Sequence, residues 1–108
     1  MSTVDYKECE SIIRKAIKGE IKVKLHKDQK YDWDYQASGN VRFMFGDNEL
    51  TFFNDVGEVD YLDNIKLSDG RIGEFLDWYD FRTEFGSSLS LEEEKELERL
   101  IRTATHNP

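Results

Sequence analysis

The first thirty residues show a hydrophobic pattern of helical period that changes abruptly to a period of two. The apolar positions at helical spacing are Cys9, Ile12, Ile13, Ala16 and Ile17. This spacing predicts a helix over residues 3 to 18, which begins at a Ser2 or Thr3 cap and ends at Gly19. After Gly19, apolar side chains alternate with lysines from residue 21 to residue 25, which predicts a strand with a basic outer face.

Three further segments have the composition of strands. Val41 to Phe45 and Glu49 to Phe53 are rich in β-branched and aromatic residues, and Gly46-Asp47-Asn48 between them fits a short hairpin loop. Val59 to Leu67 alternates only at its start and then changes to the spacing of a helical turn, so we expect it as a fourth strand with a weaker pattern.

The segment between the first strand and this hairpin is polar and aromatic. Residues 28 to 40 end in Ser38-Gly39-Asn40, which is a turn signal. Tyr31, Trp33 and Tyr35 alternate with acidic residues and could extend as a strand. The pattern leaves their register open.

The C-terminal third predicts two helices. Apolar residues at helical spacing after the Ser68-Asp69-Gly70 turn are Ile72, Phe75, Leu76 and Tyr79, which mark a short second helix. Ser90 and Glu93 then form a capping-box pattern that starts a third helix. The apolar stripe of this helix consists of Leu97, Leu100, Ile101 and Ala104.

This order of elements predicts an α+β fold in a single domain over residues 1–108. The expected architecture is an N-terminal helix, an antiparallel meander sheet of three or four strands, and two C-terminal helices packed on the sheet. A chain of 108 residues can bury about two-thirds of its unfolded surface, which is enough for one core.

Charge is sorted along the chain, whose formal net charge is −8. Between Tyr31 and Ile65 there are eight carboxylates and one basic residue, Arg42, whereas the first thirty residues carry eight Lys/Arg and five Asp/Glu. A net negative field repels nucleic-acid backbones and anionic membranes. We therefore expect no direct binding to nucleic acid or to a membrane.

The N-terminus and the cysteine content bear on the compartment. Cys9 is the single cysteine, so no internal disulfide can form and a reducing environment is the simpler assumption. The first residues lack the basic start and apolar run of a signal peptide, and no apolar run approaches the length of a membrane span. We expect a cytoplasmic protein.

The common catalytic and metal-binding patterns are missing from the sequence. His26 at the end of the first strand and His106 near the C-terminus belong to no motif, and we expect both to be solvated surface residues. One cysteine and two distant histidines cannot form a zinc site, and no stretch matches an EF-hand loop. An irregular divalent-metal site near Asp55, Glu58 and Asp60 stays open. We expect no enzymatic activity and no cofactor.

Two weaker patterns have structural explanations. Gly70-Arg71-Ile72-Gly73 matches the G-x-x-G of RNA-clamping loops, but its flanks are acidic, so we interpret it as a turn before a helix. Phenylalanines at four strand positions are compatible with a base-stacking platform, although aromatic residues on a half-buried sheet usually form the core. These residues are Phe43, Phe45, Phe52 and Phe53.

The alternation of rings and carboxylates from Tyr31 to Tyr35 points to a contact surface, because five consecutive residues cannot all be interior. Exposed aromatic side chains surrounded by carboxylates are typical of interface anchors. The predicted partner-binding residues are Asp32, Trp33, Asp34, Tyr35, Asp55, Glu58, Asp60, Tyr61 and Asp63. Among them, we expect Trp33, Tyr35 and Tyr61 to be the anchors.

The second half of the chain resembles a family of small uncharacterised bacterial proteins, a domain of unknown function, over roughly residues 50–101. The motifs that carry the resemblance are Leu50-Thr51-Phe52-Phe53-Asn54-Asp55, Val59-Asp60-Tyr61, Ser68-Asp69-Gly70-Arg71, Trp78 and Leu89-Ser90-x-x-Glu93. The chain departs from the family pattern in the spacing of Glu98 and Leu100 and in Tyr31 to Tyr35. The resemblance implies a compact domain and supplies no activity or catalytic residues.

The functional expectation is a small acidic inhibitor that binds a basic, nucleic-acid-handling protein or nucleoprotein complex and occupies its site. In composition the chain is similar to nuclease-toxin immunity proteins and to phage anti-defence proteins such as anti-CRISPR proteins. Two alternatives stay open. One is a small-molecule- or metal-binding module with its pocket near Trp78 and Tyr79, and the other is a housekeeping domain whose acidic face is merely solvated. The oligomeric state is left open.

Overall fold

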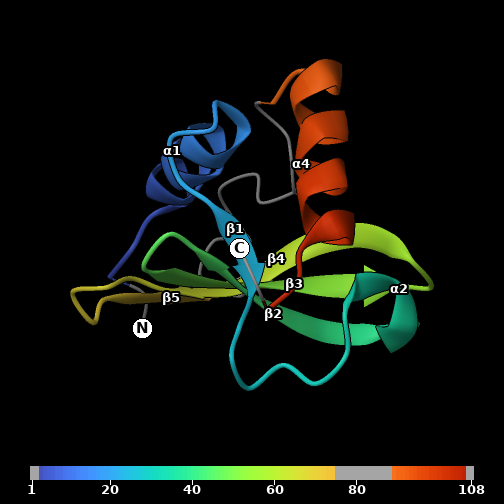
Figure 1. The fold of residues 1–108 in the computed structure, drawn as a ribbon. Helices are drawn as coiled ribbons and strands as arrows, with labels where there is room; N and C mark the ends of the chain where they lie inside the picture. Colours follow the sequence, from blue (N-terminus) through green and yellow to red (C-terminus); the bar gives the residue numbers. More distant parts are fainter. Residues whose placement is uncertain (1–2, 75–88, 107–108) are drawn as a thin grey trace.

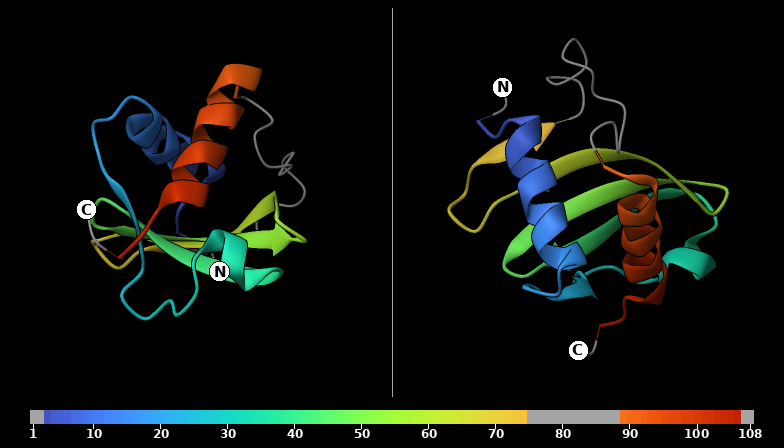
Figure 2. Two further views of the ribbon diagram at one scale, coloured as in Figure 1. Left: turned by 45° about the vertical axis from the view of Figure 1, so that its right-hand side comes forward. Right: turned by 90° about the horizontal axis from the view of Figure 1, so that it is seen from above.

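A meander sheet with two helices on one face forms the fold (Figures 1 and 2). The computed structural model describes residues 3–74 and 89–106. In this part of the chain, each strand pairs antiparallel with the next one in sequence. The strands are β1 (Val23–Leu25), β2 (Gly39–Phe45), β3 (Asn48–Asp55), β4 (Glu58–Lys66) and β5 (Ile72–Glu74). The α+β class and the meander are confirmed, with five described strands in place of three or four.

Helices α1 (Tyr6–Ile17) and α4 (Leu91–Thr103) lie side by side over the same face of the sheet (Figure 2). The predicted capping box of α4 is confirmed, because the Ser90 hydroxyl accepts the Glu93 amide and the Glu93 carboxylate accepts the Ser90 amide. The predicted cap of α1 is wrong: the Asp5 carboxylate, and not Ser2 or Thr3, accepts the amide of Glu8 at 2.8 Å. An aspartate is the stronger cap because its charge also faces the positive end of the helix dipole.

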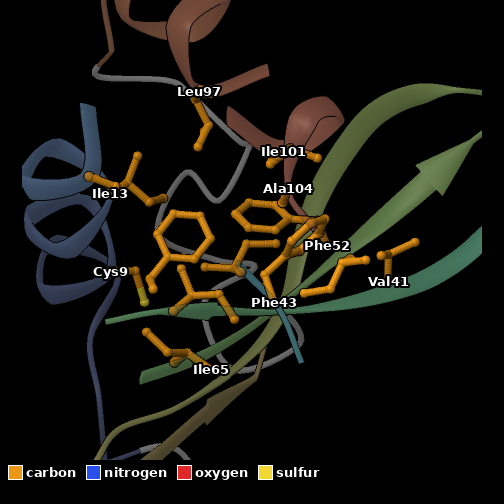
Figure 3. Packing of buried hydrophobic residues seen from close by; sticks show 14 of the residues in the cluster. Cys9, Ile13, Val41, Phe43, Phe52, Ile65, Leu97, Ile101 and Ala104 are labelled. Atoms are coloured by element: carbon orange, nitrogen blue, oxygen red, sulfur yellow. The ribbon is translucent and has the colours of Figure 1, made fainter. Parts of the chain in front are cut away.

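The hydrophobic core lies between the helices and the sheet (Figure 3). Buried side chains from α1 and α4 meet those of the three central strands, as the alternating pattern predicts. The fully buried members include Ile13, Val41, Phe43, Phe45, Leu50, Phe52, Leu62, Ile65, Leu97 and Ile101. Three of the four strand phenylalanines are therefore core, whereas Phe53 lies on the other face of β3 and stacks on Tyr61, with ring centroids 5.3 Å apart.

Two predicted elements differ from the structure. Residues 33 to 36 form a short helix, α2 (Trp33–Gln36), and not an extension of a strand. Ile72, expected at the start of a second helix, lies in β5, so the G-x-x-G match leads from a turn into a strand. The remainder of that predicted helix lies outside the described residues. Backbone pairing with β4 decides the conformation of Ile72, and helical spacing could not reveal this pairing.

The terminal segments cover both edges of the sheet. The amide of Leu25 in β1 donates to the carbonyl of Thr105 at 2.9 Å, and the amide of Thr3 donates to the carbonyl of Ile72 in β5 at 2.8 Å. Unpaired edge groups are templates for association with other strands. The two ends of the chain therefore satisfy part of both edges.

Candidate protein-binding surface

The segment rich in rings and carboxylates forms α2 at one end of the sheet, beside the turn between β3 and β4 (Figure 1). Asp32 is the cap of α2, because its carboxylate accepts the amide of Tyr35 at 2.9 Å. This cap directs the Trp33 side chain inward, where it is 0 % exposed and lies 6.1 Å from the ring of Phe43. The prediction that Trp33 is an exposed contact anchor is therefore wrong. A short helix places adjacent residues on different sides, which allows one ring to be interior and the next to be exposed.

The turn between β3 and β4 contains only Val56 and Gly57, because Asp55 pairs directly with Glu58. Both turn residues have positive φ, 51° at Val56 and 90° at Gly57, as a type I′ hairpin turn requires. Glycine adopts this conformation readily, but a β-branched residue does so with strain. The Val56 side chain is nevertheless 82 % exposed, so its presence in the turn contributes nothing to the core.

Two buried groups hold α2 against this turn. The indole Nε1 of Trp33 donates to the carbonyl of Gly57 at 2.9 Å. Asn54, which is fully buried, donates from Nδ2 to the Trp33 carbonyl at 3.0 Å and accepts the Gly57 amide at 2.6 Å. Because both hydrogen-bonding groups of the Asn54 amide are used, α2 and the turn form one connected unit.

Arg102 in the last turn of α4 adds a third element to this unit. Its Nη2 donates to the Gly57 carbonyl at 2.8 Å, its Nη1 pairs with the Asp34 carboxylate at 3.2 Å, and its Nε pairs with Glu98 at 3.1 Å. A guanidinium group can satisfy three acceptors at once because its donors form a rigid fork. Arg102 therefore links α4, α2 and the turn.

We call the exposed side chains of this unit the acidic tip. Its members are Tyr31, Asp32, Asp34, Tyr35, Asp55, Val56 and Glu58. Tyr35 is 74 % exposed and stacks on Tyr31, with ring centroids 4.9 Å apart. The acidic tip thus combines four carboxylates with three exposed apolar or aromatic side chains.

The remaining predicted contact residues follow Glu58 along β4. Tyr61 is half-buried on the sheet face opposite α1 and α4, where it stacks on Phe53. The Asp63 carboxylate accepts hydrogen bonds from Asn64 at 2.8 Å and Asn40 at 3.5 Å. Asp60 also belongs to β4. The fold therefore brings Asp32, Asp34, Tyr35, Asp55 and Glu58 to one end of the sheet and leaves Tyr61 and Asp63 further along β4.

Sequence reasoning missed Val56, Asn54 and Arg102. The signal for Val56 was present, because a two-residue loop ending in glycine between two strand patterns indicates a type I′ hairpin. No local signal marks Asn54 or Arg102, since the contacts that join them to α2 and the turn include partners 21 to 68 residues away along the chain.

The predictions about histidines and metal binding can be compared with the structure. His26 is 8 % exposed, so the prediction of a solvated surface residue is wrong. Its Nδ1 accepts the Asp28 amide at 3.0 Å, and its Nε2 lies 2.8 Å from the Glu49 carboxylate. In the described part of the chain, no group of three or more His, Cys, Asp and Glu side chains is placed to hold a metal ion. The pocket predicted near Trp78 and Tyr79 lies outside the described residues.

A protein-family model described as Domain of unknown function (DUF7693) matches residues 3–103. The chain belongs to this family. The match extends beyond the residues 50–101 that carried the resemblance in sequence, and it includes both helices over the sheet and the whole acidic tip. The DUF7693 description assigns no activity. No curated protein and no solved structure matches the chain. Within the described ranges, no helix has the length and apolar character that crossing a membrane requires.

Proposed function

We propose that this protein is a non-enzymatic inhibitor whose acidic tip docks on a basic surface of a nucleic-acid-handling protein and occupies that surface. The observation that carries the proposal is the exposure of Tyr35 and Val56 among carboxylates, on two elements that buried Trp33 holds together. Aromatic and apolar anchors within a polar rim are the usual anatomy of a protein interface.

Two features of the turn between β3 and β4 oppose folding, which supports a role in binding. Val56 is β-branched at positive φ, and the like-charged Asp55 and Glu58 face each other directly across the two strands. Each arrangement is locally destabilising. Local conflicts of this kind are expected where function, and not folding, determines the residue.

The hydrogen bonds beneath the acidic tip favour binding by reducing the entropy that docking must remove. Trp33, Asn54 and Arg102 all bond to the backbone of Gly57 or of α2, so the turn and α2 are ordered before a partner arrives. Preordered binding elements lose less conformational freedom on association. Tyr35 and Val56 can then contact a partner without rearrangement of the backbone.

Charge supports a basic partner. The chain carries 23 Asp/Glu against 15 Lys/Arg, and four of the carboxylates belong to the acidic tip. Complementary fields raise association rates about 10- to 10³-fold, and the effect weakens as salt increases. Carboxylates on a protein surface can take the place of phosphates on a site that normally binds nucleic acid, which is the proposed mode of inhibition.

The proposal is tested by capture from a bacterial lysate with the immobilised protein at low and high salt. The test variant is Asp55→Lys with Glu58→Lys, and the control is Glu20→Lys with Asp47→Lys, which changes the net charge equally at exposed positions outside the acidic tip. We expect the wild type and the control to retain a nucleic-acid-binding protein that the test variant releases.

The captured protein is then assayed for nucleic-acid binding in the presence of the inhibitor. Competition between the two ligands supports occupation of the site. Simultaneous binding of both, or equal capture by the test variant, would contradict the proposed function.

A further inference from the structure

We infer that a pocket beside β1, separate from the acidic tip, binds a small organic anion. The pocket has a volume of about 490 Å³ and is lined by Lys24, Leu25, His26, Lys27, Met44 and His106. This volume lies within the range of about 300 to 1,000 Å³ that is typical of small-molecule sites. The inference does not depend on the proposed function, because the two sites share no residue.

Two ammonium groups at this pocket have no partner among the described residues. Neither Lys24 nor Lys27 forms an ion pair or a side-chain hydrogen bond within residues 3–74 and 89–106. They belong to a basic segment, residues 14 to 30, which carries seven Lys/Arg against two Asp/Glu in a chain that is acidic as a whole. An acidic protein that leaves these lysines unpaired beside a concave surface provides a local site for negative charge.

The nearest carboxylates do not cancel this charge. Glu49 is already engaged by His26 Nε2 at 2.8 Å and by Arg42 Nη2 at 3.4 Å. Asp28 is the other acidic neighbour, with its carboxylate 3.9 Å from His26 Nδ1. Both carboxylates face His26, so among the described residues Lys24 and Lys27 stay available to bind an anion.

The walls of the pocket are fixed by backbone contacts. The carbonyl of Thr105 accepts the amide of Leu25 at 2.9 Å, which attaches the C-terminal segment to β1. His106 Nε2 then donates to the carbonyl of Gln29 at 2.6 Å. Because a carbonyl oxygen can only accept, Nε2 carries the hydrogen of this bond. The other ring nitrogen, Nδ1, has no hydrogen-bond partner in the described part of the chain.

The apolar lining indicates the rest of the ligand. Met44 on β2 pairs directly with Lys24 on β1, and the next residue of β1, the core residue Leu25, also lines the pocket. Small-molecule sites generally combine an apolar lining with a few polar groups that fix orientation. The chemistry of the pocket therefore fits a phosphate or carboxylate group attached to an apolar body, with Lys24 and Lys27 binding the anion.

The test uses phenyl phosphate and benzoate as anionic probes and benzyl alcohol as the neutral probe, added to ¹⁵N-labelled protein and followed by NMR. We expect at least one anion to cause saturable shifts of the amides of residues 24 to 27 and of the Met44 methyl, with a Kd of about 1 mM or tighter. Benzyl alcohol should cause none. The stronger of the two anions identifies the preferred anionic group.

Two double variants distinguish binding in the pocket from attraction to the overall charge of the protein. Lys24→Gln with Lys27→Gln should weaken binding of the stronger anion at least about tenfold. The control, Lys7→Gln with Lys95→Gln, makes the same charge change at exposed positions on α1 and α4 and should bind as the wild type does. Absence of saturable shifts with either anion, or an equal loss in the control, would overturn the inference.

Discussion

The indole Nε1 of Trp33 donates a 2.9 Å hydrogen bond to the carbonyl of Gly57, 24 residues further along the chain. A side chain that the sequence marks as a contact residue is therefore a buried support for the surface around it. Trp33 orders α2 and the turn together, and Tyr35 and Val56 are displayed as a result.

Trp33→Phe should lower the free energy of unfolding by about 0.5 to 1.5 kcal/mol through loss of the hydrogen bond, in addition to a smaller packing loss. Trp33→Ala should lower it by about 3 to 5 kcal/mol because it also leaves a large cavity. Urea denaturation followed by circular dichroism measures both values. Equal stability of Trp33→Phe and the wild type would show that the bond to Gly57 contributes nothing.

Val56→Asn should stabilise the protein and weaken partner capture. Asparagine followed by glycine suits a type I′ turn, so the change should raise the free energy of unfolding by about 1 kcal/mol. Removal of the exposed apolar side chain should at the same time reduce retention of the partner. Thermal unfolding and the capture assay measure the two effects.

Val56→Thr is the matched control for this change, because threonine keeps the β-branch and the strain but introduces a hydroxyl. It should leave stability nearly unchanged. A lower stability of Val56→Asn than of the wild type would contradict the assignment of strain to Val56.

Reversal of the charges at Asp55 and Glu58 should slow partner association without changing stability. The pair is like-charged before and after the double change to lysine, so the repulsion across the hairpin is preserved. Asp32 and Asp34 are less suitable positions, since Asp32 caps α2 and Asp34 pairs with Arg102. Association rates measured by surface plasmon resonance at several salt concentrations should fall and lose most of their salt dependence.

Ser90→Ala should lower the free energy of unfolding by about 0.5 to 2 kcal/mol, because it removes the hydroxyl that accepts the Glu93 amide at the start of α4. Ser11→Ala, at an exposed position within α1, removes a hydroxyl that caps nothing and serves as the control. Chemical denaturation of both variants gives the comparison. A loss of equal size in Ser11→Ala would show that the cap is not responsible.

Cys9 should be unreactive toward a thiol reagent such as DTNB at pH 8 until the protein unfolds. The side chain is buried, and burial together with the nearby Asp5 and Glu8 carboxylates raises the pKa of the Cys9 thiol from 9.0 to about 12. The thiolate, which is the reactive form, is thus suppressed in the folded state. Rapid labelling without denaturant would contradict this placement.

The raised pKa of Cys9 makes the stability of the protein decrease as the pH rises above 9.0. Between pH 9.0 and about 12 the unfolded chain loses the Cys9 proton while the folded chain keeps it, so the contribution of Cys9 to stability is complete below pH 9.0 and falls as the pH rises through this window. Stability of Cys9→Ala should decline less steeply than that of the wild type over the same range. Other groups titrate in both proteins, and the difference between the two curves isolates the thiol.

Local sequence signals predicted the elements that are stabilised by contacts between residues close together in the sequence. The Ser90 capping box starts α4 because its two hydrogen bonds join residues three positions apart. The hairpin of β2 and β3 follows from alternation on each side of a short polar loop. Helical spacing was misleading at Ile72, because pairing with Lys66 in β4 determines its conformation.

By itself, the sequence determined the α+β class, the order of most elements, the phenylalanine core and the separation of basic and acidic segments, because periodicity and charge are properties of neighbouring residues. Only the tertiary structure decided which rings are exposed. Trp33 and Tyr35 have the same kind of neighbours along the chain, but Trp33 fills the core and reaches Gly57, whereas Tyr35 faces solvent. Burial depends on contacts between residues distant in sequence, and no local pattern contains that information.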